Sequence, residues 1–156
     1  MSQEDQKGAN VKVPPPLIFI LWMLTAYAIE QWLPSGLVIA ESIKQVAVIL
    51  MLIAALLLLH MLLMFKRQQT AVEPWKPTTH IITSGYYRFS RNPIYLTFCF
   101  YPVGLGCIES SWWLISSFLP ACFTVYHLAI KREERYLQQK FPQDYAQYCN
   151  KVRRWI

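Results

Sequence analysis

The sequence lacks the cysteine pattern of a metal site or of a disulfide framework. Its four cysteines, Cys99, Cys107, Cys122 and Cys149, show neither metal-ligand spacing nor a paired arrangement. Three of them lie in apolar blocks, where a free cysteine behaves as a small hydrophobic residue. We therefore expect no bound metal and no disulfide scaffold.

A secretory signal and a basic soluble domain are also missing. Residues 1–13 carry no apolar run and are expected to be disordered. Pro14, Pro15 and Pro16 prevent a helix from starting early, and the apolar block that follows has no small-residue cleavage site. We expect that block to be a retained membrane helix. No basic patch lies on a soluble domain, so nucleic-acid binding is not expected.

What the sequence does have is long apolar blocks, and 54% of its residues are hydrophobic. A helix needs about 20 apolar residues to cross a bilayer. Four blocks approach this length, although the third is short and contains Pro102, Gly104 and Gly106. We predict an all-α integral membrane protein with about four transmembrane helices in one domain, residues 1–156. Its parts are two N-terminal transmembrane helices (14–65), a cytoplasmic connector (66–93), a helical hairpin (94–130) and a cytoplasmic C-terminal helical cap (131–156).

The positive charges are sorted along the chain. With four crossings, fourteen of the fifteen lysines and arginines fall on one side, and Lys44 is the exception. The positive-inside rule then places both termini in the cytoplasm. Four ionisable groups lie at membrane depth, where such groups are costly and often functional. We interpret Glu30 and Glu109 as interfacial and His60 as a packing residue, and leave open whether His127 lines a site.

Polar residues gather at both ends of the last apolar hairpin. Arg91 and Asn92 precede Pro93, which suits the first turn of a helix whose free N–H groups can hold an anion. Glu133 and Glu134 follow the hairpin, and its tight outer turn at residues 109–111 makes the two ends neighbours. This arrangement suits a zwitterionic ligand with a positive centre. The alternative is that Arg91 only anchors the helix at lipid headgroups while the glutamates pair with nearby lysines and arginines on the surface.

These residues resemble a known family. The chain is similar, over roughly residues 77–156, to the isoprenylcysteine carboxyl methyltransferases, small integral-membrane enzymes related to phospholipid N-methyltransferases. The resemblance rests on residues 85–96, on Glu133-Glu134 with Leu137, on Phe141-Pro142-Gln143-Asp144-Tyr145 with Tyr148, and on Val152-Arg153-Arg154-Trp155.

The resemblance implies S-adenosylmethionine as the methyl donor and a membrane methyltransferase as the activity. It implies that Glu134, Glu133 and Arg91 are catalytic residues. It also implies a cofactor site, covered by the C-terminal cap, that consists of Gly85, Tyr86, Arg91, Asn92, Pro93, Tyr95, Glu133, Glu134, Tyr145 and Tyr148. The sequence departs from the family pattern in three ways. Asn92 replaces a histidine, Ala129 and Ile130 stand where an arginine is usual, and Pro142 replaces a glycine after Phe141. The missing arginine puts the identity of the substrate in question, because arginine is a natural partner for a carboxylate.

Several readings of function stay open. The methyl acceptor is expected to be a lipid-like or isoprenylated-thioether carboxylate, with a phospholipid or amine N-methyltransferase as the alternative. An NADPH-dependent membrane reductase and a non-catalytic membrane partner protein are the other candidates. The asparagine and the short length are typical of a bacterial member, so we expect an inner-membrane protein in contact with membrane lipids. The oligomeric state is left open between a monomer and a homodimer.

Overall fold

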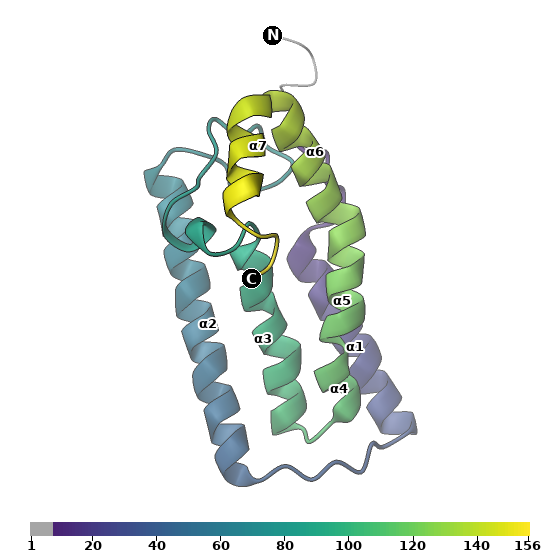
Figure 1. Ribbon diagram of the computed structural model, residues 1–156. Coiled ribbons are helices and arrows are strands. Elements are labelled where there is room, and N and C mark those ends of the chain that lie inside the picture. Colours follow the sequence, from purple (N-terminus) through teal and green to yellow (C-terminus); the bar gives the residue numbers. More distant parts are fainter. Residues whose placement is uncertain (1–7) are drawn as a thin grey trace. The chain divides into compact units, whose positions relative to one another are not determined.

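The structure is a computed structural model that describes residues 8–156, so residues 1–7 of the segment expected to be disordered lie outside the described part. Residues 8–156 are helical with no strand, which confirms the all-α prediction. The elements are α1 (Pro15–Trp32), α2 (Glu41–Arg67), the 3₁₀ turn η2 (Gly85–Arg88), α3 (Pro93–Ile108), α4 (Trp112–Ser116), α5 (Phe118–Val125), the π-helical segment η3 (Tyr126–Ile130), α6 (Lys131–Lys140) and α7 (Pro142–Lys151) (Figure 1).

Two helices of the described part are long and apolar enough to cross a membrane. They are α2, with a mean hydropathy of 3.0, and the continuous helical run Trp112–Lys140, with a mean hydropathy of 1.5. Large apolar side chains on α2, such as Leu52 and Leu56, are more than half exposed, as expected of a surface that meets lipid rather than water. The other two crossings, the side on which the cap lies and the location of the termini stay predictions.

The chain divides into two compact units, which are described separately. Unit 1 combines the described part of Met1–Val13 with Leu59–Ile94 and Tyr126–Ile156. Unit 2 combines Pro14–Leu58 with Tyr95–Val125. Within unit 1, residues 8–13 lie against the connector, since the Ala9 N–H donates to the Pro74 carbonyl at 2.7 Å.

In unit 2, α1 packs against α4 and α5. The Trp22 indole N–H donates to Thr124 Oγ1 at 3.0 Å across this contact. The tight turn expected at residues 109–111 is confirmed, and the Ser111 hydroxyl caps α4 by accepting from the Leu114 N–H at 3.2 Å. Glu30 accepts hydrogen bonds from the Ser111 hydroxyl and from the Ser35 N–H, so its carboxylate ties the end of α1 to this turn.

Two glycines of α3 permit close helix contacts within unit 2. A Cβ at Gly104 would meet the Met51 side chain of α2, and a Cβ at Gly106 would meet the backbone of Ile115 in α4. Glycine therefore lets α3 approach both neighbours at distances that a larger residue would prevent.

In unit 1, α6 and α7 pack against each other after the chain reverses at Phe141 (Figure 1). Proline cannot continue a helix but suits its first turn, and Pro142 ends α6 and begins α7 as the sequence predicts. The inner face of α7 carries Tyr145, Tyr148 and Val152, which form the core of this unit. Side chains from the connector and from α6 complete that core: Ile81, Tyr87, Leu137, Phe141 and Cys149.

Candidate functional site

The π-helical segment η3 fixes the start of α6, where the two glutamates lie. Ala129 and Ile130 at its end are completely buried, so the backbone that carries Glu133 and Glu134 is held by packing. Single π turns inside α-helices occur frequently at functional sites, because they re-aim the side chains that follow. The helix of the fourth apolar block continues into α6, which confirms the expectation, and the π-helical turn η3 lies at the junction.

The connector reaches α3 through a short shaped segment. Gly85 has a φ of +60°, a conformation that favours glycine, and it starts the turn η2. The Ser90 hydroxyl then accepts from the Asn92 N–H at 3.1 Å, and Pro93 begins α3 as expected. Asn92 is buried, so the position of its side-chain amide is fixed by packing.

Glu134 lies between two arginine side chains. It accepts hydrogen bonds from Arg154 Nε at 2.8 Å and from Arg154 Nη2 at 3.0 Å, one to each carboxylate oxygen. Arg91 Nη1 lies 3.4 Å from Glu134 Oε1. We call Arg91, Glu134 and Arg154 the carboxylate cluster. The expected proximity of the two hairpin ends is confirmed for Arg91 and Glu134.

The C-terminal segment is hydrogen-bonded to the same region. The Arg91 N–H donates to the Arg153 carbonyl at 3.0 Å. Asn92 Nδ2 donates to the Arg154 carbonyl at 3.0 Å, and the Ser90 hydroxyl donates to that carbonyl at 3.3 Å. The chain end is therefore fixed by its backbone beside the carboxylate cluster.

Arg91 has an unused donor. Its Nη1 lies 2.7 Å from Cys149 Sγ, but its Nε is buried and has no hydrogen-bond partner among the described residues. Buried polar atoms without partners are rare in folded proteins and require an explanation such as a bound group. The cluster offers this free donor beside a carboxylate, which is the donor set that a ligand with both an acidic and a basic group would need.

Aromatic rings surround the cluster. The Arg154 guanidinium lies 5.1 Å from the centroid of the Tyr126 ring, within the range of a cation–π contact. The hydrogen bond to Glu134 raises the pKa of Arg154. Burial raises the pKa values of Tyr145 and Tyr148, so both phenols stay protonated near neutral pH. The Tyr148 hydroxyl donates to the Tyr87 carbonyl at 2.7 Å and thereby links α7 to the connector.

The remaining predicted site residues fall into different surroundings. Tyr86 packs edge-on against His60, with ring centroids 5.5 Å apart, which supports the interpretation of His60 as a packing residue. Glu133 lies close enough to Tyr87 to raise the pKa of that phenol, although burial is the larger cause. Tyr95 is buried and belongs to unit 2. The assignment of all these residues to a cofactor stays a prediction.

Three residues of the site were missed by sequence reasoning: Arg154, Tyr126 and Cys149. Arg154 is part of the chain-end motif, but nothing in that motif indicates that its side chain turns toward Glu134. Among the described residues, the ion-pair partners of Glu134 are Arg91 and Arg154 rather than the lysines and arginines of α6. Arg132 donates to the Asn10 carbonyl at 2.9 Å, and Lys140 donates to the Tyr136 hydroxyl at 3.2 Å.

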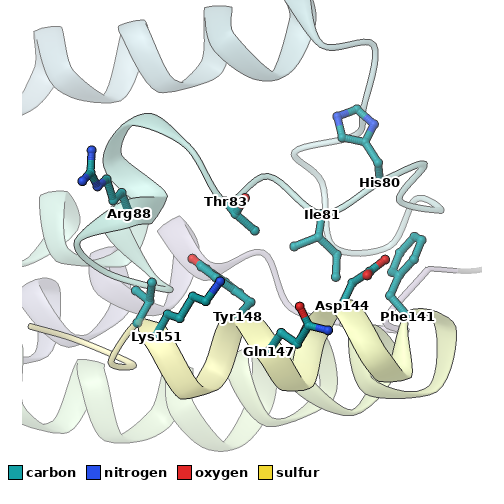
Figure 2. Close-up of a pocket in the computed structure, with 10 residues that line it drawn as sticks. His80, Ile81, Thr83, Arg88, Phe141, Asp144, Gln147, Tyr148 and Lys151 are labelled. Carbon is teal, nitrogen blue, oxygen red and sulfur yellow. The ribbon is translucent and has the colours of Figure 1, made fainter.

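A groove of about 600 Å³ lies between the connector and α7. Figure 2 shows Asp144, Gln147 and Lys151 along this helix and His80 with Thr83 on the opposite wall. Of the predicted site residues only Tyr148 lines the groove, so the groove and the carboxylate cluster are distinct features of unit 1. Within residues 8–156, no group of three or more histidine, cysteine, aspartate or glutamate side chains could hold a metal ion.

These features define a helical protein with membrane-length apolar helices and a polar, arginine-rich cluster next to its C-terminus. The chain belongs to the phospholipid methyltransferase family, whose model matches residues 43–144. Comparisons with curated proteins and with solved structures found no match. The family supports an enzyme that transfers methyl groups at a membrane. The matched range contains Arg91 and Glu134, whereas Arg154 lies beyond it.

Proposed function

We propose that this protein is an S-adenosylmethionine-dependent methyltransferase that acts on a lipid-like acceptor at the membrane surface. The observation that carries the proposal is the carboxylate cluster, in a chain of the phospholipid methyltransferase family. The amino-acid end of this cofactor carries an ammonium and a carboxylate group. A glutamate between two arginines, one of which has a free buried Nε, offers partners for both charges.

The roles of the side chains follow from their contacts. S-adenosylmethionine supplies a methyl group that its sulfonium already activates, so the protein has mainly to position it in line with the acceptor. Asn92 is buried and held at the start of α3, and we assign it a positioning role. Tyr145 and Tyr148 support the site from the inner face of α7, where both are buried.

We assign different roles to Glu134 and Glu133. Both carboxylate oxygens of Glu134 accept hydrogen bonds from Arg154, which suits a binding role. We assign the proton-accepting role to Glu133 when the acceptor is an amine, since an amine must lose a proton as its bond to the methyl carbon forms. A carboxylate acceptor needs no base. The resemblance to isoprenylcysteine carboxyl methyltransferases favours a carboxylate as the methyl acceptor. The match to the phospholipid methyltransferase family favours the amine of a phospholipid headgroup.

Binding to the purified protein tests the proposal. We expect the full chain in detergent to bind S-adenosylmethionine in equilibrium dialysis and not to bind NADPH. Glu134→Gln removes the charge between the two arginines and is expected to lower the affinity by about tenfold or more. Glu73→Gln is the matched control, because Glu73 pairs with the exposed Lys76 within the connector.

Transfer of a labelled methyl group to a membrane lipid extract then identifies the acceptor. Label in an amine headgroup supports the phospholipid reading, and label in a base-labile ester supports the carboxylate reading. Absence of cofactor binding by the parent chain, or equal binding by the parent and Glu134→Gln, would show that the cluster is not a cofactor site.

A further inference from the structure

The C-terminal segment places an arginine side chain that the matched family range does not include. Arg154 lies three residues beyond the end of α7 and reaches back to Glu134 on α6. Its backbone carbonyl is held by Asn92 and Ser90, so the origin of the side chain is fixed. The guanidinium is held by Glu134 and by the Tyr126 ring.

We propose that Arg154 binds the carboxylate of the cofactor's amino-acid end and leaves Glu134 to the ammonium group of the same end. This inference rests on the proposed function. In the structure Arg154 and Glu134 satisfy each other. A ligand with one negative and one positive group replaces this single ion pair by two, and neither side chain loses an oppositely charged partner.

Arg154 is better suited than Arg91 to recognise a carboxylate directly. Its side chain is 36% exposed, whereas that of Arg91 is 14% exposed. Arg91 is also held from several sides, by Cys149 at its guanidinium and by the Arg153 carbonyl at its backbone. A guanidinium has five N–H donors in a fork that matches a carboxylate, and the contact with Glu134 uses Nε and Nη2.

Arg154 also bears on the departure from the family pattern at Ala129 and Ile130, where the resemblance implies an arginine. Both of these side chains are uncharged, and both are completely buried. Arg154 brings a guanidinium to Glu134 from the opposite end of the cap. The C-terminal segment thus brings to Glu134 a cation that Ala129 and Ile130 do not provide.

A comparison of two ligands with two proteins tests the inference. S-adenosylmethionine and its decarboxylated analogue differ only in the group that Arg154 would bind. We expect Arg154→Gln to weaken binding of S-adenosylmethionine by about tenfold or more, because a charge-assisted hydrogen-bonded pair is lost. Binding of the decarboxylated analogue should stay unchanged or become tighter, since Glu134 loses its internal competitor. Arg135→Gln is the matched control, because Arg135 is the exposed residue directly after Glu134.

The measured quantity is the ratio of the affinities for the two ligands. A purely structural role of Arg154 would leave this ratio unchanged. Equal weakening of both ligands would assign Arg154 to holding the chain end and would overturn the inference, as would an unchanged affinity for both. If Arg154→Gln does not fold, Arg154→Lys keeps the charge but loses the fork, and a preference equal to that of the parent then overturns the inference. A parent chain that binds neither ligand instead removes the proposed function itself.

Discussion

The contact of α3 with α4 gives a sharp test of the packing in unit 2. An added Cβ at Gly106 would lie 2.5 Å from the Ile115 nitrogen and 3.0 Å from its Cα. These are backbone atoms, and they can yield only if the two helices move apart. An added Cβ at Gly104 would instead meet the Sδ and Cγ atoms of Met51, and the nearest backbone atom, the Ala47 carbonyl oxygen, is 3.6 Å away. A methionine side chain is flexible and can change rotamer.

We therefore expect Gly106→Ala to lower the free energy of unfolding by about 1–3 kcal/mol, the usual cost of overpacking. Gly104→Ala should be nearly neutral. Both glycines lie inside α3, so the gain in helix propensity, about 1 kcal/mol, is common to both variants and cancels in the comparison. Thermal unfolding in one detergent at one scan rate measures the difference, at roughly 2–4 °C per kcal/mol for a chain of this size. Equal midpoints for the two variants would refute the close contact at Ile115.

Three further predictions concern unit 1. Tyr148→Phe leaves the Tyr87 carbonyl without its donor and should destabilise the cap by about 1 kcal/mol or more in thermal unfolding, clearly more than Tyr145→Phe. Because burial raises the pKa of Tyr148, the unfolded chain releases the phenol proton first, so stability should fall as the pH rises above about 10. If the stability of the Tyr148→Phe variant falls as steeply above this pH as that of the parent chain, Tyr148 is not the cause of the decline. Asn92→Asp replaces the side-chain donor to the Arg154 carbonyl by an acceptor, which releases the C-terminal segment. Trypsin should then cleave this segment several times faster than in the parent chain. An unchanged cleavage rate would show that the hydrogen bond does not hold the segment.

Much of the helical framework could be predicted because its signals are local. The apolar block from residue 46 to residue 65 became the centre of α2, which extends to Glu41 and Arg67. Pro93 and Pro142 begin α3 and α7, since a fixed φ suits a first helical turn. The turn at residues 109–111 could be recognised from the polar break between two apolar blocks.

The composition of the site was harder to predict, because it depends on which way a side chain turns. Arg153 and Arg154 are adjacent, and the sequence does not distinguish them. The structure does, because α7 ends at Lys151 and Val152 is buried in the core of unit 1, which directs Arg154 toward Glu134. The π-helical segment also has no sequence signal, since its apolar residues would fit an ordinary α-helix equally well.

The energetics of the carboxylate cluster are consistent with the proposed ligand site. Partly exposed ion pairs contribute only about 0–1 kcal/mol to stability. A buried donor without a partner, as at Arg91 Nε, costs about 1–3 kcal/mol. The cluster thus adds little to the stability of the cap, and a hydrophobic arrangement of similar volume would serve a purely structural purpose at least as well. Two arginines held at one glutamate, with a free donor beside them, instead suit the proposed recognition of a ligand with both charges.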